Sequence, residues 1–345
     1  MGGFGKLFLA RYGITALFWL SASLAVAQDS SGSLTEHGHP NLQGYWTNPF
    51  QTPLERPSNL GNKRAYSAEE AQSLIDRALA MDVERQAPLD PDRAAPEAGG
   101  TVDNQADGNF EIMPTELARV DGEYRTSFII EPVDGRIPWR AGGKDIHQNW
   151  REQGKARFDG PEGLTPLDRC LNPGAQLPLI FIFGGVGHEL GNPAGDNPVR
   201  NVQIVQNKDY VVILAEYFSL VRIIRIDSEF RPEVGARWMG DSVGYYENNS
   251  LVVHTRHFRA EQSIAPLRSS DSFEVKETFT RTSDNEILFQ YTITDPNIYS
   301  QAWTAQIPLQ RMEEGLKLYE YACHEGNYAI PSMLRAVRME EAGLL

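Results

Sequence analysis

Nine strand-like runs separated by short turns follow one another near the end of the chain, and they constrain the fold more than any other feature. Short turns with residues typical of hairpins separate the runs, for example Asn207-Lys208-Asp209 and Ser283-Asp284-Asn285. Many sequential strands with short turns are typical of an antiparallel barrel or a strongly curved sheet. The sequence therefore predicts a mainly β, lipocalin-like barrel, with strands at 201–206, 210–217, 220–227, 236–246, 250–258, 272–281, 286–294, 302–311 and 316–323.

The region before these strands has a different composition. Residues 28–66 are rich in Gly, Pro, Asn and Ser, which indicates an extended arm that Trp46 would attach to the rest of the protein. Ser67 and Glu70 have the spacing of a capping box, and good helix formers follow them as far as Gln86. We therefore expect one helix between the arm and the β region.

The first 27 residues have the pattern of a secretory signal peptide. Lys6 and Arg11 are basic, residues 14–27 are apolar or small, and Ala25-Val26-Ala27 forms a small-x-small cleavage site. The apolar run is shorter than the about 20 residues that a membrane helix needs. The sequence therefore predicts cleavage and a periplasmic or secreted protein.

Charge limits the partners of the mature protein. Removing residues 1–27 takes away two basic and no acidic residues, which leaves 30 Lys and Arg against 46 Asp and Glu, a net charge of about −16. Nucleic acids and anionic membranes need basic surfaces, so we expect neither as a partner, and no membrane contact after signal cleavage. The chain is expected to divide into a signal peptide (1–27), an arm, helix and loop (28–122), and an antiparallel β domain (123–345).

The chain has two cysteines, Cys170 and Cys323. An exported protein meets an oxidising compartment, where disulfides form and persist. We therefore predict one disulfide between them. Chain-entropy models assign about 4–5 kcal/mol to a crosslink that closes so long a loop.

Strand alternation places one carboxylate among apolar residues. In the run 273–281, Glu277 shares a face with Phe273, Val275 and Phe279, and the other face is polar. A carboxylate on an inward face needs a partner or has a raised pKa. Glu277 is therefore a candidate functional residue.

The last run suggests two more inward polar groups. If residues 316–324 form a regular strand, Glu320 and His324 share a face with Leu316 and Leu318. That face is predicted to look inward, toward Glu277. Two interpretations stay open: a buried polar network whose hydrogen bonds are satisfied, or an acid/base pair in a ligand cavity.

Two glycine-rich segments resemble known motifs only in part. Gly240 to Gly244 matches G-x-S-x-G, but a hairpin and a strand follow it instead of the helix that a nucleophile elbow requires. We therefore favour Asp241 as a polar pocket residue over Ser242 as a nucleophile. Gly184 to Glu189 lacks the Lys-Ser/Thr ending of a phosphate-binding loop and is interpreted as a flexible loop.

The histidines and cysteines do not form a metal-binding pattern. His254 and His257 would face opposite sides of a regular strand, and so would the adjacent Cys323 and His324. No paired Cys-x-x-Cys spacing occurs. We expect no metal, and we interpret the arm sequence His37-Gly38-His39 as incidental.

Several segments taken together resemble a family of exported bacterial proteins of unassigned function. They span roughly residues 125–328 and are specific as a set, and both cysteines fall inside them. The resemblance implies secretion and brings no reaction with it. The segments are Arg125-Thr126-Ser127 through Asp134-Gly135-Arg136-Ile137-Pro138, Arg169-Cys170-Leu171, Trp238-Met239-Gly240-Asp241-Ser242, Leu251-Val252-Val253, Asp295-Pro296 with Tyr299 and Trp303-Thr304, and Tyr319 to Tyr328.

The chain departs from the family pattern at three places. Residues 244–250 replace a segment that resembles Gly-Arg-Trp-Glu-Gly-Asp-Thr in the family. His254 stands where the family usually has a carboxylate, and His257 where an asparagine is common. If that carboxylate is catalytic, His254 could act as a base with a pKa nearer neutrality; if it is structural, the change is drift.

The first functional hypothesis is an exported, cofactor-independent enzyme that acts on a small apolar or aromatic-bearing molecule. Acid/base chemistry of the lyase, isomerase or cyclase type is what its side chains can support. His324 would be the base or acid, with Glu320 or Glu277 as its carboxylate. Further candidates are His254 and Asp241 for catalysis, and Arg225, Tyr217, Tyr321 and Trp238 for substrate binding.

Two alternatives use the same sequence features. A non-catalytic exported protein could use the buried charges to orient one small-molecule ligand. A serine hydrolase could use Ser242. The sequence determines neither the substrate nor the oligomeric state.

Overall fold

The structure is a computed structural model that describes residues 34–85, 87–88, 91–92, 115–145, 158–164, 169–171, 201–260 and 268–344. The predicted signal peptide and the glycine-rich loop at 184–189 lie outside these residues. Within the part of the chain that is described, no helix is long and apolar enough to cross a membrane.

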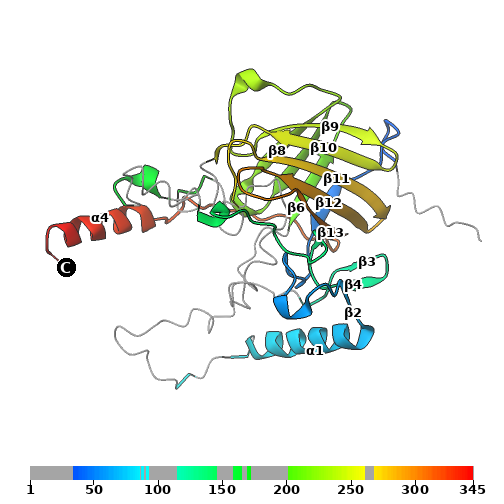
Figure 1. The fold of residues 1–345 in the computed structure, drawn as a ribbon, viewed down its shortest axis with the longest axis horizontal. Coiled ribbons are helices and arrows are strands. Elements are labelled where there is room, and N and C mark those ends of the chain that lie inside the picture. Colours follow the sequence, from blue (N-terminus) through cyan, green and yellow to red (C-terminus); the bar gives the residue numbers. More distant parts are fainter. Residues whose placement is uncertain are drawn as a thin grey trace, which may run out of the picture. The chain divides into compact units, whose positions relative to one another are not determined.

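Nine strands close into a barrel, which confirms the predicted fold class (Figure 1). Neighbouring strands are antiparallel, except that β8 and β9 are parallel. Closure comes from β1, which pairs with both β6 and β13. The strands are β1 (Gly44–Thr47), β6 (Val202–Gln206), β7 (Tyr210–Ala215), β8 (Val221–Ile226), β9 (Asp241–Glu247), β10 (Ser250–Arg256), β11 (Glu274–Ser283), β12 (Glu286–Thr294) and β13 (Trp303–Arg311).

The remaining elements come before, between or after the barrel strands in the sequence. A tenth strand, β5 (Ile129–Glu131), adds to β13, and a separate small sheet has the order β2 (Ala65–Tyr66), β4 (Glu123–Arg125) and β3 (Arg119–Val120). The helices are α1 (Ala68–Arg85) and α4 (Ala329–Glu341), with short 3₁₀ helices η1 (Ser58–Leu60), η3 (Gly143–Asp145), η4 (Pro161–Gly163), η5 (Tyr217–Ser219) and η6 (Pro232–Val234).

The capping box of α1 is confirmed. The backbone N–H of Ser67 donates to Glu70 Oε2 (2.8 Å), and the backbone N–H of Glu70 donates to Ser67 Oγ (3.2 Å). These two bonds satisfy donors that the first helical turn leaves without an intrahelical partner. By contrast, α4 was not predicted, and its first residue follows Tyr328, which provides no side-chain cap.

The barrel interior is filled by side chains from alternate strand positions. Successive aromatic rings of β11, β12 and β13 contact one another: Phe279 and Phe289 (centroids 4.6 Å apart), Phe289 and Tyr291 (5.5 Å), and Tyr291 and Trp303 (5.8 Å). All four are fully buried. Aromatic side chains bury large areas, so these rings contribute much of the core.

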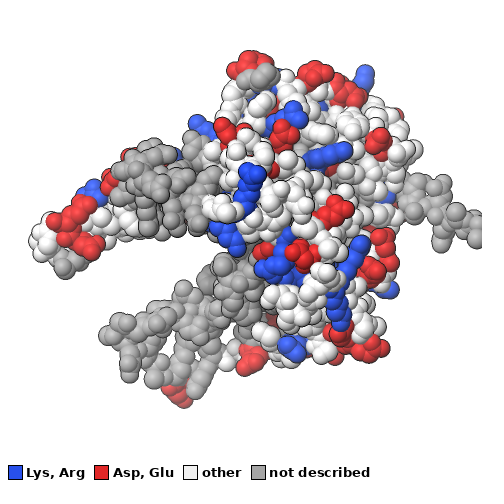
Figure 2. Space-filling model, viewed as in Figure 1, with Lys and Arg blue, Asp and Glu red and all other residues white. Residues whose placement is uncertain are grey.

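The outer face of the barrel mixes charge with exposed aliphatic groups. On the side drawn in Figure 2, basic and acidic side chains lie next to one another across the described surface. Val221 and Ile223 of β8 expose more than half of their surface, whereas Arg222 between them is buried. Which side chains of β8 face inward is therefore set by strand alternation and not by the polarity of each residue.

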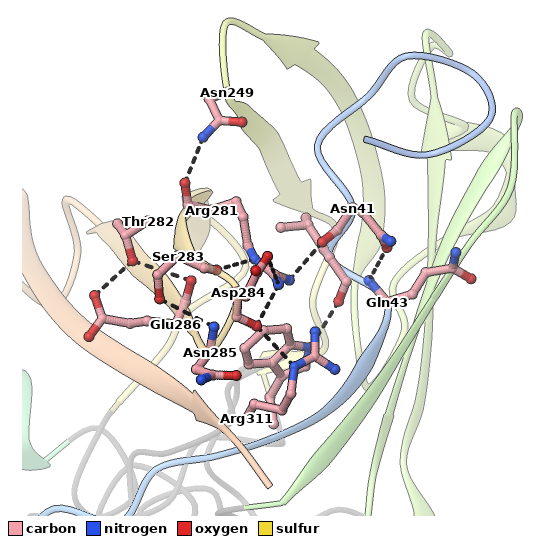
Figure 3. Close-up of polar contacts among 12 residues, drawn as sticks. Asn41, Gln43, Asn249, Arg281, Thr282, Ser283, Asp284, Asn285, Glu286 and Arg311 are labelled. Atoms are coloured by element: carbon pink, nitrogen blue, oxygen red, sulfur yellow. Dashed lines mark hydrogen bonds and ion pairs between the residues drawn. The ribbon is translucent and has the colours of Figure 1, made fainter. Parts of the chain in front are cut away.

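The arm supplies the strand that closes the barrel. Trp46 of β1 is fully buried, and its indole N–H donates to the Leu42 carbonyl (2.8 Å). The guanidinium groups of Arg281 and Arg311 lie 4.9 and 4.6 Å from its ring centroid, within cation–π range. Arg281 also donates to the Asn41 carbonyl (2.8 Å), so the same arginine contacts the arm at two residues (Figure 3).

The predicted last strand, 316–323, is wrong. These residues have no regular secondary structure, and Leu316 and Tyr319 are 48% and 75% exposed. The edge of β13 that such a strand would need is already taken, by β1 near residue 311 and by β5 near residue 304. The strand predicted at 236–246 also begins later, at Asp241.

The predicted disulfide is confirmed. Cys170 and Cys323 are joined with an S–S distance of 2.04 Å and a Cα–Cα distance of 5.6 Å. Asn327 Nδ2 lies 3.2 Å from Cys170 Sγ, and the Tyr321 ring stacks on Phe218 at 5.1 Å. The disulfide and the ring contact tie the segment after β13 to distant parts of the chain.

Candidate functional site

Four polar side chains from adjacent strands meet inside the barrel. Arg222 of β8 donates from Nη1 to Glu277 Oε1 (2.9 Å), and its Nη2 also contacts Oε2 of the same carboxylate. Arg222 Nε donates to Ser242 Oγ (3.0 Å) and Nη2 to Thr255 Oγ1 (2.7 Å). Ser242 and Thr255 lie 3.0 Å apart. We call these four residues the interior network.

The interior network confirms that Glu277 is buried and needs a partner. Burial raises the pKa of Glu277 above its usual value, while the charge and hydrogen bonds of Arg222 oppose this rise. A bidentate guanidinium and two hydroxyl groups surround the pair, so most of its hydrogen-bonding capacity is used within the protein. This geometry fits a structural role, since an isolated buried charge is costly.

Sequence reasoning missed Arg222, although the signal was present. Arg222 shares its strand face with the buried Ile224 and Ile226. Arg225, which was predicted to bind substrate, lies on the opposite face. Applying to this strand the alternation used for Glu277 would have identified Arg222 as the inward cation.

Asp241 and Arg225 pair with each other. Arg225 Nη1 donates to Asp241 Oδ1 (2.6 Å), and the backbone N–H of Arg231 donates to Oδ2 (2.8 Å). Burial acts to raise the pKa of Asp241, but these hydrogen bonds and the two arginine charges lower it to about 2. The carboxylate is therefore charged at neutral pH and already occupied, which does not suit a general acid or base.

Ser242 does not lie in a nucleophile elbow. It is the second residue of β9, and the hairpin to β10 follows that strand. Its hydroxyl is buried and contacts Arg222 and Thr255. An elbow needs a strand, a sharp turn and a helix, with the hydroxyl exposed.

The prediction that Glu320 and His324 face the interior is wrong. Both side chains are exposed in the irregular segment after β13. They are thus separated from Glu277, which lies in the barrel core. Tyr321, predicted to bind substrate, is partly exposed and stacks on Phe218. The structure therefore does not assemble the acid/base group that the sequence suggested.

His254 lies on the outer side of the barrel. It is opposite Lys276 on β11, and the Tyr245 ring lies 6.5 Å away. Burial, followed by the charges of Lys276 and Arg256, lowers the pKa of His254. The side chain lies near the cations Lys276 and Arg256 and the carboxylate of Glu274, away from the interior network.

The remaining candidates are also dispersed. Trp238 is partly buried beneath the guanidinium of Arg259, 4.9 Å from its ring centroid. The side chain of Tyr217 lies outside what the structure describes. Within the described ranges, no group of three or more His, Cys, Asp or Glu side chains is placed to hold a metal ion.

A pocket of about 250 Å³ opens where the arm passes the end of the barrel. Gln206 and Tyr246, at inward positions near the ends of β6 and β9, form its barrel side, and residues of the arm form the other. We call it the arm pocket. Its lining consists of Leu34, Thr35, Glu36, His37, His39, Asn41, Gln43, Gln206, Asn207 and Tyr246.

Contacts between the arm and the barrel hold this pocket in shape. The His39 ring is stacked on Tyr246, with centroids 4.0 Å apart and planes 8° from parallel. Gln206 binds the arm through Leu42 and Pro40. His37 and His39, interpreted from sequence as incidental, both line the pocket.

Among the candidate residues whose side chains the structure describes, none of the others lines the arm pocket. Its two sides are separated by more than 160 residues in the chain, and only their tertiary contact forms it. No protein-family model and no curated protein matches the chain. The resemblance to exported bacterial proteins therefore stays a prediction.

Proposed function

We propose that this protein is an exported, non-catalytic small-molecule-binding protein and that its ligand occupies the arm pocket. The observation that carries this proposal is the pocket itself, at the mouth of a closed barrel, with several polar side chains converging on it. Barrel mouths are common places for ligand sites.

The positions of the predicted catalytic groups favour binding over catalysis. General acid/base catalysis needs an acid or base within hydrogen-bond reach of the substrate. His324 is exposed, Glu277 is held by Arg222 in the core, and Asp241 is held by Arg225. Binding needs only a fixed set of contacts, which the arm pocket provides.

The rigidity of the arm supports the same conclusion. Trp46 is buried and contacts the guanidinium groups of Arg281 and Arg311, and Arg281 also donates to the Asn41 carbonyl of the pocket segment. A site that is ordered before its ligand arrives loses less entropy on binding. The arm pocket is preorganised in this sense.

Export is supported by the signal-like N-terminus and the disulfide. The negative net charge and the mixed charges in Figure 2 fit a protein without a nucleic-acid partner. Under this proposal, the partner is a small molecule that the protein meets outside the cytoplasm.

The test is to purify the protein from the cells that make it naturally and to record its native mass. A bound molecule appears as an added mass that is released on unfolding, and the extract then identifies it. Gln206→Leu disrupts the pocket wall and should abolish the added mass. The matched control is Gln203→Leu, on the same strand at an outward position, which should retain it. An added mass that persists in Gln206→Leu would contradict the proposed site.

A second candidate is the acid/base enzyme, favoured by one observation: burial raises the pKa of Glu277. A carboxyl group with a raised pKa can serve as a general acid. Wild type and Glu277→Gln would be incubated with a metabolite extract and compared by mass spectrometry. Conversion by wild type alone would support the enzyme, and no conversion by either would remove it.

A further inference from the structure

Hydrogen bonds in the arm pocket leave Tyr246 with a hydrogen to donate. Gln206 Oε1 accepts the backbone N–H of Leu42 (2.6 Å), and Gln206 Nε2 donates to the Pro40 carbonyl (3.1 Å) and to the Tyr246 hydroxyl oxygen (2.8 Å). Because this oxygen accepts from Gln206, its own hydrogen points toward another acceptor. Burial raises the pKa of Tyr246, so the hydroxyl keeps that hydrogen at neutral pH.

Asn207 provides a second donor of fixed orientation. Its Oδ1 accepts the backbone N–H groups of Asp209 (2.9 Å) and Tyr210 (2.8 Å) in the turn between β6 and β7. These two bonds fix the amide plane and direct Nδ2 away from the turn. Within the described ranges, Nδ2 donates to no acceptor.

The charges of the lining disfavour an anionic ligand. Glu36 contributes a carboxylate, and among the described residues that line the pocket there is no lysine or arginine. Phosphate and carboxylate ligands are usually held by such cations. The donors Tyr246 and Asn207 instead match alcohol groups, which both donate and accept hydrogen bonds. The Glu36 side chain, which is 87% exposed and lies 3.6 Å from His37 Nε2, adds an acceptor at the solvent side.

The size and lining of the arm pocket further restrict the class of ligand that it can bind. Pockets for drug-sized molecules usually measure about 300–1,000 Å³, and the arm pocket is smaller, at about 250 Å³. The His39 and Tyr246 rings, which line the pocket, are stacked face to face and so hold each other in place. A single ring fits these dimensions, whereas a long lipid chain does not.

We propose that the arm pocket binds a neutral, polyhydroxylated ring of about monosaccharide size. This ligand class, which rests on the proposed binding function, differs from the apolar or aromatic-bearing molecule expected from the sequence. The reason is that the expected site lay in the apolar barrel interior, whereas the pocket is lined mainly by amide, imidazole, hydroxyl and carboxylate groups.

The experiment titrates the protein lacking residues 1–27 with glucose, galactose, mannose, N-acetylglucosamine and myo-inositol, using ligand-detected NMR and calorimetry. Glucose 6-phosphate and indole serve as anionic and apolar comparators. At least one neutral compound should bind, and bind more tightly than either comparator. Binding of a comparator alone would overturn the ligand class while leaving the binding function intact.

Two conservative variants locate the site. Tyr246→Phe removes the hydroxyl donor, and Asn207→Asp keeps the turn acceptor while removing the amide donor. Each should weaken binding about five- to tenfold, as expected for one lost hydrogen bond. The control Tyr210→Phe, on the outer face of β7, should bind as wild type does. Unchanged affinity in both pocket variants would overturn the assignment.

The native mass of the protein from its own cells separates the remaining outcomes. If no panel compound binds but a mass is added, the released molecule decides the ligand class: a neutral polyol supports it, and any other molecule overturns it. If nothing in the panel binds and no mass is added, the proposed binding function itself fails.

Discussion

Two segments of this chain have similar alternating sequences, but only one of them forms a strand. In residues 273–281, Glu277 alternates with phenylalanines and valine, and the segment forms strand β11 with Glu277 fully buried. In residues 316–324, Glu320 and His324 alternate with leucines, yet the segment has no regular structure and both polar side chains are exposed.

The difference lies in what each segment can pair with. β11 has β10 on one side and β12 on the other. The segment 316–324 follows β13, whose free edge is taken by β1 and β5. Alternation therefore shows that a segment can form a half-buried strand, but a free neighbouring edge decides whether it does.

The largest expected effect comes from breaking the buried pair. Glu277→Gln should lower the free energy of unfolding by about 3–5 kcal/mol, because it leaves Arg222 charged and unpaired in the core. Its matched control, Glu320→Gln, changes the same side chain on the exposed segment and should have little effect. Urea unfolding curves of both variants measure the contrast.

A double variant shows whether the cost comes from the unpaired charge. Replacing Arg222 with Met and Glu277 with Leu together should recover most of the loss, because no buried charge remains. A double variant less stable than Glu277→Gln would mean that the pair itself stabilises the barrel.

The sequence predicted the barrel well, since alternation and turn residues are local. It also placed Glu277 among apolar residues correctly. It could not show that the arm completes the barrel, because β1 pairs with strands more than 150 residues away. For the same reason it could not show the arm pocket, which forms only where His39 meets Tyr246. Strand alternation would also have predicted that Arg222 faces inward, but it was not applied to this strand.

The second largest effect on the free energy of unfolding is expected from the disulfide, which anchors the irregular segment 316–324. Replacing Cys170 and Cys323 with serine should cost up to about 4–5 kcal/mol, because the crosslink closes a long loop and so restricts the unfolded chain. The two cysteines are 153 positions apart in the sequence, and the chain between them includes β6 to β13. Trypsin should also cleave faster at the exposed Lys317. Equal stability and equal cleavage in both proteins would show that the disulfide does not constrain this segment.

The third effect is a pH dependence on the outer side of the barrel. The pKa of Asp241 in the folded protein is about 2, below the value of about 3.9 in an unfolded chain. As pH falls, the unfolded state therefore binds this proton first. The stabilisation is present above about pH 4 and is lost as pH falls through about 2, a total of roughly 2 kcal/mol.

Asp241→Asn directly tests the contribution of this carboxylate to the loss of stability at low pH. The variant should lose less stability than wild type between pH 4 and pH 2, as read from unfolding curves at each pH. Parallel losses in the two proteins would show that other carboxylates account for the acid sensitivity in this range.

The smallest effect is expected at His324, the residue that the sequence placed at the centre of a catalytic site. His324→Ala should change the free energy of unfolding by less than about 0.5 kcal/mol, because an exposed side chain loses few contacts. It should also leave ligand binding in the arm pocket unchanged. A loss above about 1 kcal/mol would mean that residues 316–324 pack as a strand after all, and the barrel would then need a free edge beside β13. Because β1 and β5 occupy that edge, such a result would also require the arm to leave the barrel, which would open the pocket to which the ligand is assigned.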